Sequence, residues 1–100
     1  MKIKELLEYL KESGESFEFS GDENCEVDGF SSLKNYKEGT FTWIKKIESI
    51  PKGMDIGGCK LVVTQTGENI GCPNIIYTDS SKRVFFSLVE YFAETSNEVD

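Results

Sequence analysis

Two apolar runs lie close together in the chain, Cys59-Lys-Leu-Val-Val-Thr64 and Asn74-Ile-Ile-Tyr-Thr78. Neither run alternates between apolar and polar residues, and each has a length typical of a strand. Continuous apolar runs of this kind are typical of strands that are buried on both faces. We therefore expect two buried strands in a sheet that is covered on both sides.

Three shorter strands are expected before these runs. Phe17-Glu-Phe19 alternates between apolar and polar residues, and a second strand is expected to hold Val27 and to end near Phe30. Thr40-Phe-Thr-Trp-Ile44 is rich in β-branched and aromatic residues, which favour strands. The segment that follows, with Pro51 and several glycines, predicts a loop or a broken helix.

Two amphipathic helices are expected near the ends of the chain. Four apolar residues recur at the spacing of one helix face and predict a helix from Ile3 to Glu12; they are Ile3, Leu6, Leu7 and Leu10. A second helix is expected after Asp79 and Ser80, either of which is a plausible N-cap. Its apolar stripe would consist of Val84, Phe85, Leu88, Val89 and Phe92.

These elements predict the fold class α/β (α+β), with a small mixed β-sheet flanked by two helices. A length of 100 residues is enough for one domain with one modest core. No internal repeat is present, and no hexapeptide repeat indicates a β-helix within these residues.

The net charge of −7 argues against partners that are polyanions. Counterion release favours the binding of positively charged proteins to nucleic acid. We therefore expect neither DNA nor RNA, nor an anionic membrane surface, as a partner. The charge is uneven, because the segment from Glu12 to Asp28 carries only acidic charged residues, whereas Lys45, Lys46 and Lys52 gather in mid-chain. A local anion site is compatible with this pattern.

The cysteine and histidine content bounds the chemistry. The chain has three cysteines, Cys25, Cys59 and Cys72, and none of them forms a CxxC motif. It has no histidine. The odd number of cysteines argues against a disulfide framework, and the missing CxxC motif and histidine argue against a zinc site. Without histidine, Ser–His and Cys–His nucleophile pairs are excluded. We expect a binding domain without a metal or another cofactor.

No leader sequence or membrane span is predicted, and we expect the protein to reside in the reducing cytoplasm.

The stretch from Val27 to Ile44 reads Val-Asp-Gly-Phe-Ser-Ser-Leu-Lys-Asn-Tyr-Lys-Glu-Gly-Thr-Phe-Thr-Trp-Ile. It resembles, without a gap, the N-terminal domain of the UDP-3-O-(3-hydroxyacyl)glucosamine N-acyltransferases. The matching positions are Leu33, Gly39, Thr42, Trp43 and Ile44. The likeness continues through both apolar runs and the closing helix, and so covers most of residues 1–94. The same stretch is also similar to the N-terminal domain of the Mur peptide ligases.

The resemblance implies a uracil site at the end of the third strand. The family has an aromatic residue there, an Asn three residues later and a Tyr after three more. Trp43 matches the aromatic residue, and Lys46 and Ser49 occupy the other two positions. Trp43 offers a ring face to a base, and stacking of this kind is worth about 1–3 kcal/mol per base in single-strand binders. Lys45 and Lys46 are candidates to meet a diphosphate as point charges.

The resemblance also implies a biological role. The family transfers a 3-hydroxyacyl chain from acyl carrier protein to a UDP-linked acylglucosamine in lipid A biosynthesis. Residues 1–94 would be the nucleotide-facing domain, which binds or orients the UDP-sugar and is not itself catalytic. Residues 95–100 would begin a linker to a left-handed β-helix that holds the catalytic histidine. The piece would be a monomer, and the full-length protein a homotrimer.

Each candidate residue also has a purely structural interpretation. Trp43 can fill the core beside Phe41, which shares its face of the strand. Lys45 and Lys46 can lie on a solvated loop, as lysines usually do. The alternative function is therefore a structural or protein-interaction domain of a sugar acyltransferase that makes no contact with a nucleotide.

Overall fold

The computed structural model describes residues 1–54, 56, 58–68 and 70–97. Five strands form one sheet, which two α-helices accompany. The strands are β1 (Glu18–Ser20), β2 (Phe30–Ser31), β3 (Phe41–Trp43), β4 (Leu61–Thr64) and β5 (Ile75–Tyr77). The helices are α1 (Ile3–Glu12), the short 3₁₀ helix η1 (Ile47–Ser49) and α2 (Ser81–Asn97). The predicted fold class, a small mixed sheet with two flanking helices, is confirmed.

The strand order in the sheet is β1-β5-β4-β3-β2. Strands β2, β3, β4 and β5 run parallel to their neighbours, and only β1 is antiparallel, on the outer side of β5. The two apolar runs are the central pair, with Val62 opposite Ile75 and Val63 opposite Ile76. Parallel pairing brings the carboxyl ends of four strands to one edge of the sheet.

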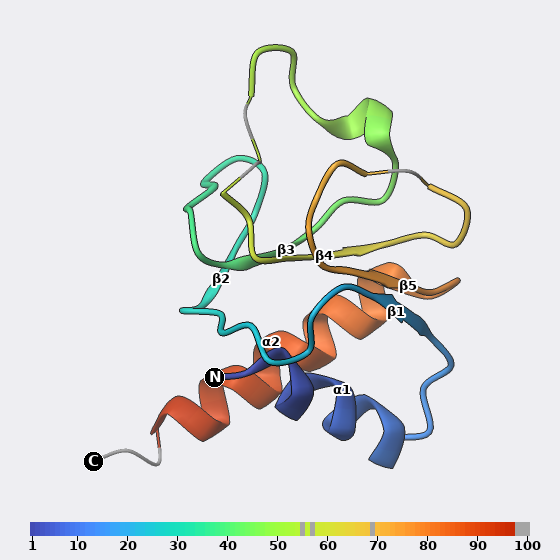
Figure 1. The fold of residues 1–100 in the computed structure, drawn as a ribbon, viewed down its shortest axis with the longest axis vertical. Helices are drawn as coiled ribbons and strands as arrows, with labels where there is room; N and C mark the ends of the chain where they lie inside the picture. The colour runs from blue at the N-terminus through green and yellow to red at the C-terminus, as the bar shows by residue number, and fades with distance from the viewer. Residues whose placement is uncertain (55, 57, 69, 98–100) are drawn as a thin grey trace.

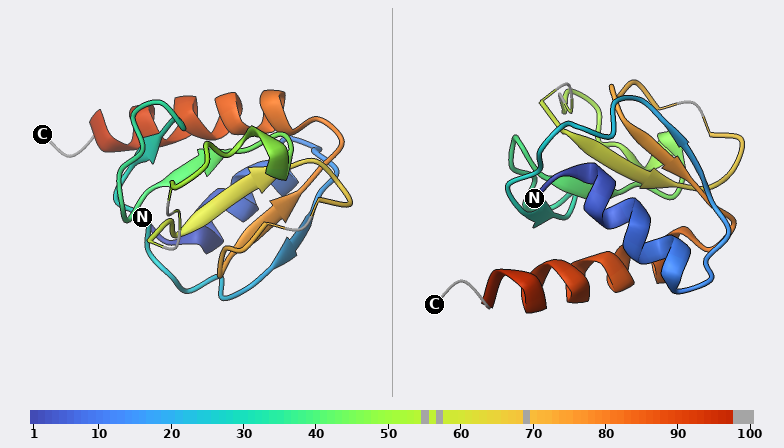
Figure 2. Two further views of the ribbon diagram at one scale, coloured as in Figure 1. Left: turned by 90° about the horizontal axis from the view of Figure 1, so that it is seen from above. Right: turned by 60° about the horizontal axis from the view of Figure 1, so that its bottom comes forward.

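Both α-helices lie on the same face of the sheet (Figures 1 and 2). The core on this face combines the apolar stripes of both helices with alternate strand residues such as Phe41, Leu61 and Val63. Leu6 and Leu10 of α1 and Leu88 of α2 are fully buried there. Burial of both stripes against one surface explains why two amphipathic helices are enough to form this layer.

The opposite face of the sheet is covered by loops (Figure 1). A second buried cluster forms there between the strands and the segments that connect β3 to β4 and β4 to β5; it contains Ile44, Ile56, Cys59, Val62, Ile70 and Ile75. The expectation that both faces are covered is therefore met without an α-helix on the second face; the β3–β4 connection there contains only the short 3₁₀ helix η1. Parallel strands are usually joined through helices, but here irregular segments make the connections.

Gly39 allows the tight turn that leads into β3. Its φ angle is +82°, a left-handed conformation that glycine adopts at low cost. Its carbonyl oxygen accepts the N–H of Asp28 at 2.8 Å, and its own N–H donates to the Gly58 carbonyl at 3.0 Å. A Cβ atom at this position would lie 2.8 Å from Oδ2 of Asp28. The turn therefore ties the segment before β2 to the segment before β4.

The boundary of one strand differs from the expectation. Val27 lies outside β2, because its N–H and C=O bond to the backbone of Met1 and its side chain is buried against the helix-side core. Helix α2 extends to Asn97, so the beginning of the expected linker at residues 95–100 is helical, and residues 98–100 lie outside the described residues. Within the part of the chain that the structure describes, neither α-helix has the length and apolar character needed to cross a bilayer.

Candidate functional site

A groove lies at the edge of the sheet where the parallel strands end. It consists of two adjoining pockets that share Trp43 at the end of β3, Lys45 just after it, and Phe86 on α2. Their volumes are about 640 and 660 Å³, within the range of small-molecule sites. We call the two pockets together the Trp43 groove. In open α/β sheets, ligands characteristically bind outside the carboxyl ends of the strands.

The first pocket has both apolar and basic lining residues. Its apolar lining comes from β2, the loop after it, β3 and α2, and consists of Phe30, Leu33, Trp43, Phe85, Phe86 and Val89. Phe30 is 43% exposed and Phe86 is 51% exposed, although both are large apolar side chains. Apolar groups left accessible in a concave surface are typical of a binding site.

The second pocket lies at the start of α2. Gln65 follows β4 and Asp79 follows β5, and both line this pocket together with Ser81, Lys82 and Arg83 of α2. The carbonyl of Ser80 accepts the N–H of Val84 at 2.9 Å, which makes Ser80 the N-cap. The positive end of the α2 dipole therefore faces this pocket and adds to the charge of the side chains.

A chain of hydrogen bonds holds Trp43 in place. The indole Nε1–H donates to Oγ of Ser81 at 2.9 Å, and the Ser81 hydroxyl donates to Oε1 of Gln65 at 2.5 Å. Gln65 in turn donates through Nε2 to the Asp79 carbonyl at 3.2 Å. The ring packs against Phe85 with 6.5 Å between centroids and 23° between planes. Trp43 is thus half-buried in a fixed orientation and still lines both pockets.

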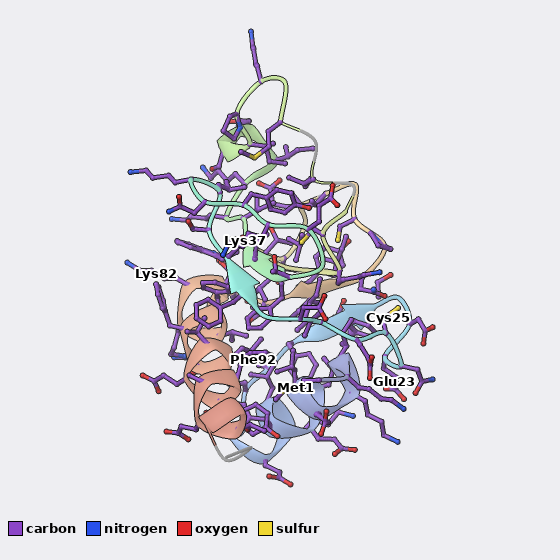
Figure 3. All side chains as sticks on the ribbon, turned by 90° about the vertical axis from the view of Figure 1, so that its left-hand side faces the viewer. Met1, Glu23, Cys25, Lys37, Lys82 and Phe92 are labelled. Atoms are coloured by element: carbon purple, nitrogen blue, oxygen red, sulfur yellow. The ribbon has the colours of Figure 1, made fainter. Side chains whose placement is uncertain are left out.

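The charge around the groove is opposite to that of the whole chain. Five of the eleven basic residues line it, namely Lys34, Lys37, Lys45, Lys82 and Arg83. Among the described lining residues, Asp79 is the one carboxylate, although the chain has 18 acidic residues. Arg83 is paired with Glu15 at 2.7 Å. Lys37, from the segment before β3, and Lys82, near the start of α2, are labelled in Figure 3.

The predicted site residues are only partly brought together. Trp43 and Ser49 line the apolar pocket, whereas Lys46 is exposed and lines neither pocket of the groove. Lys45 lies in the groove instead. Ser31, another hydroxyl at this edge, is buried and hydrogen-bonded to Thr40 at 2.7 Å.

Several lining residues could not be identified from the sequence. Lys34 and Lys37 come from the β2–β3 loop, and Phe86 and Lys82 come from a helix 45 or more residues further along the chain. No local pattern indicates that these residues converge, because their proximity depends on the parallel order of the strands.

The groups in the groove suit binding better than proton transfer. The described lining supplies aromatic rings, ammonium groups, hydroxyls and a single carboxylate, and the chain has no histidine. Among the described residues, no three Cys, Asp or Glu side chains are grouped closely enough to hold a metal ion.

No protein-family model and no curated protein matches this sequence.

Proposed function

We propose that this domain binds an anionic ligand with a planar group in the Trp43 groove, and that the ligand is a UDP-sugar. One observation carries the proposal: in a chain of net charge −7, five basic residues and the one tryptophan line the same groove. Such a groove combines an aromatic surface for a base with ammonium groups for a diphosphate.

The resemblance of residues 27–44 to the UDP-3-O-acylglucosamine N-acyltransferases supports the choice of a UDP-sugar. On this proposal the domain holds the nucleotide end of the acyl acceptor in the cytoplasm. Acyl transfer from acyl carrier protein would then take place in a β-helix domain of the same protein, within a homotrimer, for lipid A biosynthesis. The role of the domain is to bind and orient, and Trp43, Lys45 and Ser49 are the contacts expected from the groove.

The test is a titration of the domain with UDP and UDP-N-acetylglucosamine, followed by Trp43 fluorescence and by calorimetry. A saturable change in the emission of the one tryptophan is expected for both ligands. A flat response in both measurements, from a protein that circular dichroism shows to be folded, would contradict the proposal.

Lys45 and Lys46 form a matched pair of variants for this titration. Both are exposed lysines after β3, but only Lys45 lines the groove. Lys45→Ala is expected to weaken UDP binding roughly tenfold, the equivalent of about 1.4 kcal/mol, and Lys46→Ala to leave it unchanged. Equal effects of the two variants would mean that the nucleotide does not occupy this groove.

A second candidate function is a protein-interaction domain without a nucleotide. The exposure of Phe30 and Phe86 in the groove favours this alternative, because accessible apolar patches also mark protein interfaces. The nucleotide titration of the unmodified domain distinguishes the two candidates. If the groove binds a protein and no nucleotide, that titration is flat from the start.

A further inference from the structure

Cys59 and Cys72 occupy equivalent positions before two neighbouring parallel strands. Cys59 lies three residues before Val62 and Cys72 lies three residues before Ile75, and Val62 and Ile75 are register partners. Adjacent strands are about 4.7–4.9 Å apart, and a disulfide requires a Cα–Cα distance of about 4.4–6.8 Å. The register of β4 and β5 therefore brings the two segments that carry the cysteines side by side.

Hydrogen bonds just before the two strands hold the segments that carry the cysteines together. The Val62 N–H donates to the Asn74 carbonyl at 3.0 Å, and Nδ2 of Asn74 donates to the Lys60 carbonyl at 2.8 Å. The thiol of Cys72 donates to the carbonyl oxygen of Cys59 at 3.5 Å, so its sulfur directly contacts the Cys59 residue. Both are free cysteines.

The two thiols differ in pKa and in exposure. A hydrogen bond from Cys59 lowers the pKa of Cys72 to about 7. The same contact, together with burial, raises the pKa of Cys59. Cys72 is half-buried and Cys59 is buried. The partly accessible thiol is thus the one that ionises first, and thiolates are the nucleophiles in disulfide exchange.

We propose that Cys59 and Cys72 are a redox modification site that closes reversibly to an intramolecular disulfide. The oxidant is a small-molecule disulfide. The Cys72 thiolate attacks one of its sulfurs, forms a mixed disulfide and releases one thiolate. The Cys59 thiol then loses its proton and attacks Sγ of Cys72, which forms the Cys59–Cys72 bond and releases the second small thiol. Two electrons pass from the protein to the oxidant, which leaves as two thiols.

The site is separate from the Trp43 groove. The two cysteines lie at the amino ends of β4 and β5 and pack in the cluster on the loop-covered face, whereas the groove lies at the carboxyl ends. The bridge would link the segments that enclose this cluster. The proposal therefore does not depend on the identity of the ligand in the groove.

Cys25 provides an internal control. It packs against the core on the helix side of the sheet, and Figure 3 shows it beside Glu23, away from the loop-covered face. It has no cysteine partner in the described structure. A Cys25→Ser variant therefore keeps the proposed pair and removes the third thiol.

The test is incubation of the full chain with oxidised glutathione near neutral pH, followed by intact mass measurement and peptide mapping. Trypsin cuts after Lys52, Lys60 and Lys82, so Cys59 and Cys72 fall in separate peptides, residues 53–60 and 61–82. The native protein and Cys25→Ser are expected to lose the mass of two hydrogens within the pair and to yield these two peptides cross-linked. A dithiol reductant is expected to reverse the change.

The single variants test the division of roles. Cys59→Ser is expected to retain glutathione on Cys72, because the attacking thiol for the second step is gone, and Cys72→Ser is expected to leave Cys59 unmodified. Glutathione that stays on Cys72 in the native protein, or a pair that keeps both thiols free, would overturn the proposal. The native protein alone decides this, even if a variant fails to fold.

Discussion

The indole of Trp43 has a structural contact and an accessible surface at the same time. Its Nε1–H is held by Ser81, and its ring packs on Phe85, yet it lines both pockets of the groove. The two interpretations of this residue, core packing and ligand contact, are therefore compatible. The contacts with Ser81 and Phe85 fix the orientation in which the ring lines the groove.

The anchor can be tested by Ser81→Ala. This change removes the acceptor of the Trp43 N–H and a donor to Gln65, at a side chain that is 1% exposed. An unsatisfied buried polar group costs about 1–3 kcal/mol, and we expect a loss of this size in the free energy of unfolding, measured in urea. Ser87→Ala, in the same helix and without a hydrogen bond from its hydroxyl among the described residues, is the control and should change it little.

The reactivity of Cys72 follows from its hydrogen bond with Cys59. Because its pKa is lowered to about 7, the thiolate fraction rises as the pH increases through this value, whereas an ordinary thiol ionises near ~8.5. In a Cys25→Ser background, the iodoacetamide labelling rate of Cys72 should rise with a midpoint near pH 7. With Cys59→Ala the donor is lost, and the midpoint should move to higher pH. An unchanged midpoint would mean that Cys59 does not cause the shift.

At the scale of elements, one face of α2 packs in the core and another face lines the groove. Val84 and Leu88 are fully buried against the sheet, while Phe86 is half exposed in the groove. The 3.6-residue period separates these faces, so a single helix can contribute to stability and to binding independently.

Two substitutions in α2 should separate stability from binding. Leu88→Ala removes a fully buried side chain from the helix-side core and should cost about 2–5 kcal/mol, read as a lower urea midpoint. Phe86→Ala should change the free energy of unfolding by no more than about 0.5 kcal/mol but weaken ligand binding in the groove. If Phe86→Ala destabilises the protein as strongly as Leu88→Ala, Phe86 is a core residue.

Elements with strong periodicity were predicted well. The bounds of α1 agree with the prediction, and the two apolar runs contain β4 and β5. Strand β2 was less predictable, since Val27 pairs with the chain terminus and lies before the strand. Short strands at a sheet edge are determined by their partners more than by their own residues.

At the scale of the whole molecule, the charge is segregated. The groove is basic and the rest of the chain is acidic, because segments distant in the sequence bring Lys34, Lys37, Lys45 and Lys82 to one edge. A local basic site on an acidic protein attracts small anions while the net charge repels extended polyanions.

This arrangement predicts that ligand affinity depends on salt. The Debye length falls from about 30 Å at 0.01 M to about 8 Å at 0.15 M, which screens the exposed lysines of the groove. The dissociation constant for UDP should therefore rise several-fold over this range in calorimetry. In Lys45→Ala the rise should be smaller. Affinity that does not change with salt would show that the lysines do not contribute to binding.

The sequence by itself determined the fold class, both helices and the central strand pair, because apolar periodicity depends only on neighbouring residues. It also indicated Trp43 and the lysines after β3 as candidates. Only the tertiary structure decided that Lys45, and not Lys46, lines the groove, that Lys34, Lys37 and Phe86 join it, and that Cys59 meets Cys72. These contacts arise from strand order and register, which link residues far apart in the chain and leave no local pattern.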